Sequence, residues 1–148
     1  MSNCLRMLDI VVQLADERLL VRDGLVNING SPMIKHLTID RALLANESMA
    51  EVVREELYTR FSIDINDHDK SSMDVKQFCS ETTHQDMLLY IYVVSFKKTM
   101  HLKVKPWEVY RAKRREELIL EVKAGSIYSP NARIALEQIN KRGLLDER

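Results

Sequence analysis

Two glutamates in the segment from residue 46 to residue 65 are spaced to hold a divalent cation. Glu51 and Glu55 are four residues apart, so on an α-helix they project from neighbouring turns of one face. Two carboxylates placed in this way can share a magnesium ion, which prefers hard anionic oxygen ligands. Arg54 lies between them, and the three side chains could equally form an ordinary solvated surface. Both interpretations stay open on the sequence alone.

The chain around these glutamates has the pattern of an amphipathic helix over residues 46–60. Apolar side chains recur at helical spacing and form one stripe: Met49, Val52, Val53, Leu57 and Phe61. Asn46 or Ser48 can cap the start of this helix, and Glu47 complements the positive end of its dipole. The candidate metal ligands therefore lie on the polar side of a helix whose other side packs on a core.

Basic side chains offer a second kind of chemistry, because they can hold the phosphate groups of a nucleotide. Lys103 and Lys105 alternate with other residues in the basic segment 97–105. The same alternation is typical of a charged edge strand, which is the interpretation we favour. His84, in the polar segment 81–85, is placed to line the mouth of a substrate pocket. The four histidines fall in different predicted elements, so no pair has the spacing of metal ligands.

A second basic cluster opens a predicted helix: Arg111, Lys113, Arg114 and Arg115. Basic residues at the start of a helix are unfavourable for its dipole, which points to an anionic neighbour. Trp107 and Tyr110 precede this helix and could stack on a base, although strand aromatics more often pack in the core.

Composition narrows the class of protein. The 148 residues include 22 basic and 22 acidic side chains, and this weak net field argues against binding nucleic acid by bulk charge. The longest apolar run, 87–96, is about half the length of a membrane span. Cys4 and Cys79 have neither disulfide nor metal spacing, and the N-terminus is unlike a signal peptide, so we expect a cytoplasmic protein.

Periodicity and turn residues predict a single domain over residues 1–148, with the order strands, helix, strands, helix, helix. The strands are expected at 8–14, 18–22, 25–28, 33–39, 62–65, 75–79, 87–96 and 107–112. Loops are expected at 40–45, 66–72 and 81–85, and the later helices at 114–123 and 130–141. The 87–96 strand is apolar on both faces, which places it at the centre of the sheet. The predicted fold class is α/β, a mixed sheet with helices on both faces.

This order, with an acidic helix after the first strands, resembles the Nudix family. The family's box is glycine, five residues, glutamate, seven residues, arginine-glutamate, an apolar residue, any residue, glutamate-glutamate, any residue, glycine and an apolar residue. Arg54-Glu55 resembles its arginine-glutamate, and Glu47-Ser48 its upstream acidic segment, one residue too close. Later features that fit the family's course are Tyr110, then Glu116-Glu117-Leu118, then Gly125 before the last helix.

The resemblance implies a Nudix-like α/β/α sandwich and a hydrolase of nucleoside-diphosphate-linked compounds that uses magnesium. In the family, the glutamates of the box hold magnesium, which polarises a pyrophosphate and activates water. Here the two positions of the glutamate pair hold Tyr58 and Thr59. The position of the closing glycine holds Phe61, and that of the apolar residue holds Glu56. Glu55 alone carries over as a metal ligand.

Three functions follow from this degenerate active site. The first is a Nudix-type hydrolase whose activity is weak or lost, with Glu55, Arg54 and Glu51 as the residues of the former catalytic site. The second is a non-catalytic module that binds a nucleotide or a protein partner and needs no metal. The third is an active hydrolase whose magnesium is held by Glu51 and Glu55. All three are compatible with a homodimer and none involves a membrane.

Overall fold

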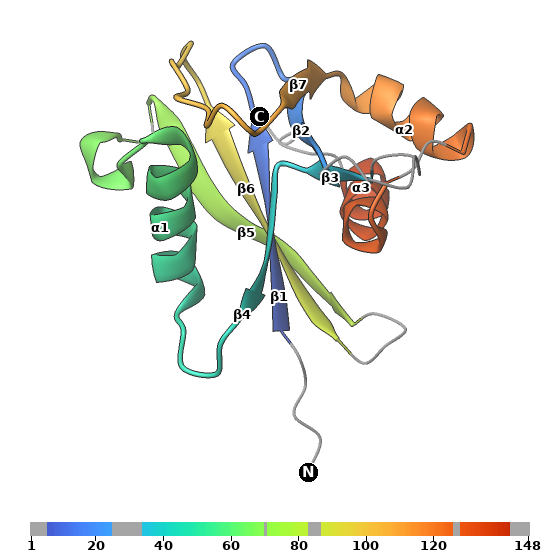
Figure 1. Ribbon diagram of the computed structural model, residues 1–148, viewed down its shortest axis with the longest axis horizontal. Coiled ribbons are helices and arrows are strands. Elements are labelled where there is room, and N and C mark those ends of the chain that lie inside the picture. The colour runs from blue at the N-terminus through green and yellow to red at the C-terminus, as the bar shows by residue number, and fades with distance from the viewer. Residues whose placement is uncertain (1–5, 25–33, 70, 83–86, 126–127, 143–148) are drawn as a thin grey trace.

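In the part of the chain that the structure describes, seven strands form one mixed sheet with α-helices on both of its faces (Figure 1). The computed structural model describes residues 6–24, 34–69, 71–82, 87–125 and 128–142. The strands are β1 (Arg6–Gln13), β2 (Leu19–Asp23), β3 (Lys35–Leu37), β4 (Ile39–Leu43), β5 (Met73–Thr82), β6 (Leu88–Phe96) and β7 (Tyr110–Lys113). The helices are α1 (Met49–Phe61), the 3-10 turn η1 (Ile65–Asp67), α2 (Arg115–Lys123) and α3 (Pro130–Arg142). The predicted order of strands and helices is confirmed.

Strand β1 is the middle of this sheet. The strand order is β3-β2-β1-β6-β5, while β4 also pairs with β1 and β7 pairs with β2. The β1–β6 pair is parallel, and the other pairs are antiparallel. Strand β6, which the sequence places at the centre, is instead the parallel neighbour of β1. Both strands are buried on both faces, so hydrophobicity alone does not separate them.

Two hydrophobic cores, one on each face of the sheet, hold the helices in place. On one face α1 buries its apolar stripe against side chains of β1: Val52, Val53, Leu57 and Phe61 against Leu8, Ile10 and Val12. On the other face α2 and α3 contribute Leu118, Ala132, Ala135, Leu136 and Ile139. The predicted α/β/α sandwich is therefore confirmed, and Figure 1 shows α1 on one side with α2 and α3 on the other.

The strand predicted over 33–39 is confirmed for residues 35–37, which form β3, but the loop predicted over 40–45 is wrong for residues 40–43, which belong to β4. The chain kinks at Thr38, whose φ of 22° ends β3, and β4 then pairs with β1. The Thr38 hydroxyl stabilises the kink by donating to the Leu20 carbonyl at 2.7 Å and accepting from the Val12 N–H at 3.0 Å. Strand β4 escaped prediction because its middle is polar, and only its ends, Ile39 and Leu43, are buried.

The predicted strand over 62–65 is also wrong. Ser62 adopts a left-handed conformation, with φ of 58°, and caps the end of α1 before the chain enters η1. Strand β5 is longer than predicted at both ends, so Glu81 and Thr82 belong to it and not to a loop. The expected strand over 25–28 lies outside the described residues.

The ends of the last two helices follow the sequence signals. Gly125, with φ of 90°, follows α2, and its N–H donates to the Val122 carbonyl at 3.2 Å. Ser129 is buried before α3, and its Oγ accepts from the Ala132 N–H at 3.1 Å. Pro130 then occupies the first helical position, where its missing N–H costs nothing.

Replacing the Ser129 cap should weaken the α3 face of the sandwich. Ser129→Ala is expected to cost about 1 kcal/mol of unfolding free energy, because a buried helical N–H loses its acceptor. Urea denaturation measures this loss. Ser48→Ala is the matched control, since Ser48 precedes α1 without a side-chain capping bond. Equal losses in the two variants would contradict the role assigned to the Ser129 hydroxyl.

One carboxylate is buried inside the sheet. Asp9 of β1 is 1% exposed and lies opposite Asp40 of β4. Arg22 binds Asp40 at 2.7 Å, and His36 Nδ1 lies 3.6 Å from the same carboxylate. Asp9 Oδ1 has no hydrogen-bond partner among the residues that the structure describes. Burial, and then the nearby Asp40, raise the pKa of Asp9 well above its ordinary value, and Arg22 opposes this shift.

Candidate functional site

The predicted catalytic residues lie on the outer face of α1. Glu51 and Glu55 are exposed, and Glu51 accepts a hydrogen bond from Arg54. This ion pair raises the pKa of Arg54. The arrangement matches the solvated-surface interpretation for Glu51 and Arg54, while Glu55 projects beside them.

These carboxylates do not fit a magnesium centre. No three His, Cys, Asp or Glu side chains within the described residues are grouped closely enough to hold a metal ion. Glu51 and Glu55 supply two carboxylates at most, and an arginine already neutralises the first of them. Magnesium demands near-octahedral oxygen coordination, which such an open pair provides poorly.

A half-buried ionic network runs along the inner edge of α1 instead. Glu56 of α1 lies between two arginines, 3.2 Å from Arg60 and 3.6 Å from Arg41 of β4. Arg41 also binds Glu47 at 2.6 Å, and Arg60 binds Glu108 at 2.7 Å. We call these five side chains the α1 ionic network. Each of them is less than one third exposed, so its contacts are less screened than surface pairs.

Sequence reasoning missed this network, although part of its signal was present. Glu56 and Arg60 are four residues apart at the border of the apolar stripe, a spacing that brings side chains together on a helix. Arg41 and Glu108 come from segments that were predicted as a loop and a strand. Arg41 and Glu108 contact α1 only because β4 and the 97–109 segment pass beside it. The hydrophobic pattern of the sequence predicted neither feature.

Tyr110 connects the network to the core beneath it. Its hydroxyl donates to Glu108 at 3.2 Å, and its ring packs edge-on against Phe61 with centroids 5.1 Å apart. Burial raises the pKa of Tyr110, so the hydroxyl stays protonated and able to donate. The prediction that Tyr110 packs in the core is confirmed. Trp107 is instead 71% exposed, and it does not belong to a strand, because β7 begins only at Tyr110.

The basic segment 97–105 is not an edge strand. Residues 97–105 adopt no strand conformation, and the next strand, β7, begins only at Tyr110 and pairs with β2. This segment passes the end of α1, where the Lys103 N–H donates to the Phe61 carbonyl at 3.3 Å. The side chains of Lys103 and Lys105 are exposed. His84, the third predicted substrate-binding residue, lies outside the described residues.

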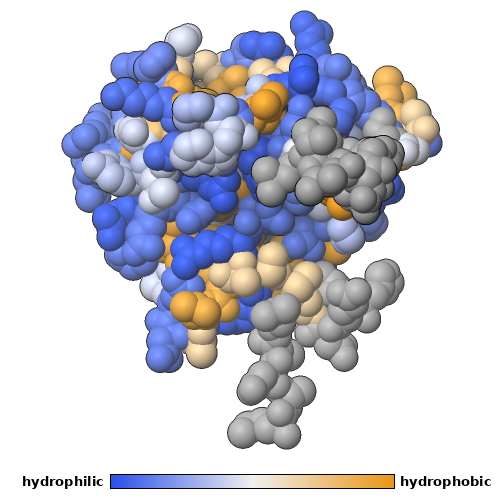
Figure 2. Space-filling view, viewed as in Figure 1, coloured by the Kyte–Doolittle hydropathy of each residue, from blue (hydrophilic) through white to orange (hydrophobic). Residues whose placement is uncertain are grey.

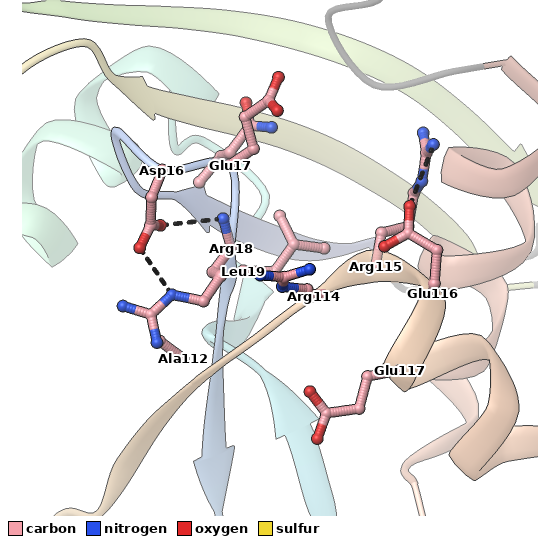
Figure 3. Close-up of a pocket in the computed structure, with 10 residues that line it drawn as sticks. Asp16, Glu17, Arg18, Leu19, Ala112, Arg114, Arg115, Glu116 and Glu117 are labelled. Carbon is pink, nitrogen blue, oxygen red and sulfur yellow. Dashed lines mark hydrogen bonds and ion pairs between the residues drawn. The ribbon is translucent and has the colours of Figure 1, made fainter.

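A pocket of about 750 Å³ opens at a different place, between the β1–β2 turn and the start of α2 (Figure 3). No residue of α1 lines it. Its lining is Gln13, Asp16, Glu17, Arg18, Leu19, Ala112, Arg114, Arg115, Glu116 and Glu117. The predicted catalytic side chains and the pocket are therefore two separate sites.

The face in Figure 2 is mostly hydrophilic, with hydrophobic residues in small patches. Large exposed apolar side chains include Tyr58 on α1 and Trp107 in the segment after β6. None of the described helices is both long and apolar enough to cross a lipid bilayer.

Comparison with known proteins supports the fold and leaves the function open. No protein-family model and no curated protein sequence matches this chain. Among solved structures, it is similar to DR0079 from Deinococcus radiodurans, with a TM-score of 0.72 and 12% sequence identity. The similarity covers 90% of this chain and 82% of that one. At this identity the likeness concerns the arrangement of the sheet and helices alone.

Proposed function

We propose that this chain is a Nudix-like domain whose magnesium-dependent hydrolysis of nucleoside-diphosphate-linked compounds is weak or lost. The observation that carries this proposal is the α1 ionic network. Glu56, the best-shielded carboxylate of α1, is neutralised by Arg41 and Arg60, so it has little need of a cation. The exposed pair Glu51 and Glu55 lacks a third ligand among the described residues.

Burial along α1 also supports a second alignment of the Nudix box. The box has an apolar residue two positions before its glutamate pair, and the buried Val53 suits that slot better than the half-buried Glu56. If Val53 takes the apolar position of the box, Glu55 and Glu56 take the positions of the glutamate pair. Val52 then takes the position of the glutamate that follows the arginine. Both alignments leave the ligand set at least one carboxylate short, which supports the same proposal.

The ligand we propose is a nucleotide-type small molecule bound without catalysis. The exposed side chains of Lys103 and Lys105 extend from the segment beside α1, and their ammonium groups suit phosphate. A protein partner is the second candidate, favoured by the exposed ring of Trp107, since tryptophan often anchors interfaces. A cytoplasmic location and a homodimer are part of this proposal.

Hydrolysis is the decisive measurement. The protein is incubated with a panel of nucleoside-diphosphate-linked compounds, with and without magnesium, and release of phosphate and nucleoside monophosphate is followed. We expect no magnesium-dependent release above background, because a two-carboxylate site positions neither metal nor water well. Double substitution of Glu51→Gln and Glu55→Gln serves as the comparison. Magnesium-dependent turnover that this variant abolishes would establish the relocated metal site instead.

A further inference from the structure

The connection between β6 and β7 concentrates positive charge at one place on the surface (Figure 1). Residues 97–107, which we call the lysine–tryptophan segment, contain four lysines and one histidine but no acidic residue. All five of these side chains are exposed: Lys97, Lys98, His101, Lys103 and Lys105. The balance of 22 basic and 22 acidic side chains in the whole chain therefore conceals an uneven distribution, and this part of the surface attracts anions.

Nearby acidic residues neutralise only part of this charge. Glu108, which follows the segment directly, already belongs to the α1 ionic network. Lys98 lies close enough to Asp69 to interact with its carboxylate. No ion pair joins Lys103 or Lys105 to a residue in the part of the chain that the structure describes. These two ammonium groups are therefore available to an external anion.

The fold holds the backbone of the segment in place beneath its charges. The Lys103 N–H donates to the Phe61 carbonyl at the end of α1, and Met100 and Leu102 pack against the core on the α1 face of the sheet. Little backbone entropy is lost when a ligand binds side chains on such a support. Residues 97–105 adopt no strand conformation, so protection of a sheet edge does not explain their lysines.

Trp107 lies in a tight turn directly after these lysines. The Glu108 N–H donates to the Lys105 carbonyl at 3.0 Å, and this bond closes the turn around Pro106 and Trp107. Proline restricts the backbone immediately before the tryptophan. The indole is 71% exposed, although tryptophan is on average highly buried. The turn thus exposes most of a large aromatic ring, two residues from Lys105.

Lysines and an exposed indole together fit single-stranded nucleic acid. A strand offers phosphates to the ammonium groups and unstacked bases to the ring, and this stacking requires no particular base. In a duplex the bases remain stacked on one another, so they do not reach an indole on the protein surface. An acidic protein supplies anions but no regular alternation of an anion with a flat ring.

We propose that the lysine–tryptophan segment binds a single strand of nucleic acid, with Lys103 and Lys105 on its phosphates and a base stacked on Trp107. This inference rests on the nucleotide binding proposed above for the same lysines and extends the ligand from one nucleotide to a strand. It involves neither magnesium nor hydrolysis, so it does not depend on the carboxylates of α1.

Fluorescence of the full chain tests this assignment directly, because Trp107 is its only tryptophan. Oligothymidylate of about 10 nucleotides is titrated in EDTA, which prevents metal-dependent hydrolysis. Base stacking should quench the indole emission saturably, and the anisotropy of a dye-labelled copy should give the same affinity. An abasic strand of the same length keeps the phosphates but lacks the bases. It should bind at least about fivefold more weakly and leave the emission unchanged.

Substitutions of exposed side chains make the result specific. Trp107→Ala should lower the affinity at least about fivefold, whereas Trp107→Phe, which keeps an aromatic ring, should retain most of it. Combined Lys103→Gln and Lys105→Gln should reduce the slope of log affinity against log salt by about 1.4, since each phosphate contact on a single strand contributes about 0.7. Lys123→Gln is the matched control, because it removes an exposed lysine from α2, which packs on the other face of the sheet. It should change neither the affinity nor the slope.

The outcomes separate this inference from the proposed function. A strand that binds no more tightly than a nucleoside monophosphate overturns the extension to a strand and leaves the proposed nucleotide binding standing. Absence of binding by both probes overturns both. Equal binding of the abasic strand, or an unchanged salt slope in the double lysine variant, also overturns the inference and favours an acidic protein as the partner of this segment.

Discussion

Leu57→Ala should lower the unfolding free energy by about 2–5 kcal/mol, the range found for leucine deletions in packed cores. Leu57 is completely buried in the middle of α1 and packs in the core that this helix shares with β1. The substitution removes apolar contacts and leaves a cavity that the surrounding strands cannot fill, because interiors are close-packed. Chemical denaturation followed by circular dichroism measures the loss.

The neighbouring residue provides the control for this experiment. Tyr58 is 62% exposed on the opposite side of α1, so Tyr58→Ala should change stability by about half a kcal/mol or less. A loss below that value in Leu57→Ala would mean that the buried face of α1 is assigned wrongly. The α1 ionic network would then also lose its position beside the sheet.

Asp9→Asn should stabilise the protein at neutral pH by about 1–3 kcal/mol, because a neutral amide avoids the cost of ionising a carboxyl group that is buried and poorly hydrogen-bonded within the described part of the chain. The pKa of Asp9 is raised in the folded state, so its contribution to stability is greatest below its unfolded pKa. That contribution is lost as pH rises through the folded pKa. The parent protein should therefore lose this part of its stability as pH rises, whereas the variant should not.

The pH profile separates Asp9 from its neighbour His36. Burial lowers the pKa of His36, so that histidine makes the folded state more stable as pH rises toward its unfolded value. Denaturation of both proteins in urea from about pH 4 to about pH 8 measures the difference, which should widen with pH over the unfolded range of a carboxyl group and above. Parallel profiles would show that Asp9 does not hold its proton in the folded protein.

Local signals in the sequence were sufficient for elements whose own residues carry a clear helix or strand pattern. The apolar stripe of α1, the continuous apolar run of β6 and the Ser129-Pro130 start of α3 each encode their structure within a few residues. Strand β4 could not be predicted in this way, because its polar residues depend on partners from elsewhere, such as Arg22 for Asp40. Tertiary pairing overrode the local pattern there.

The candidate sites show the same difference between contacts that are local in the sequence and contacts that depend on the tertiary fold. Glu51 and Arg54 pair locally, so their ion pair was among the interpretations that the sequence allowed. The pairing of Arg60 with Glu108 joins residues 48 positions apart, and Gln13 meets Ser95 across 82 positions. The basic start of α2 predicted an anionic neighbour, but the pocket beside it depends on β7 pairing with β2. Such contacts depend on the tertiary fold, so no periodic pattern in the sequence predicts them.

The parallel pairing of β1 with β6 has a consequence for how the chain folds. Gln13 and Ser95 are 82 positions apart, so the centre of the sheet closes only after that length of chain has been synthesised. The antiparallel neighbours of β1, strands β2 and β4, are available much earlier. Contacts of high sequence separation slow folding, and until β6 arrives one edge of β1 exposes unpaired backbone groups. A nascent chain that has not yet reached residue 88 therefore exposes the unpaired edge of an apolar strand. We expect this stage to be the one at which the chain needs a chaperone to prevent aggregation.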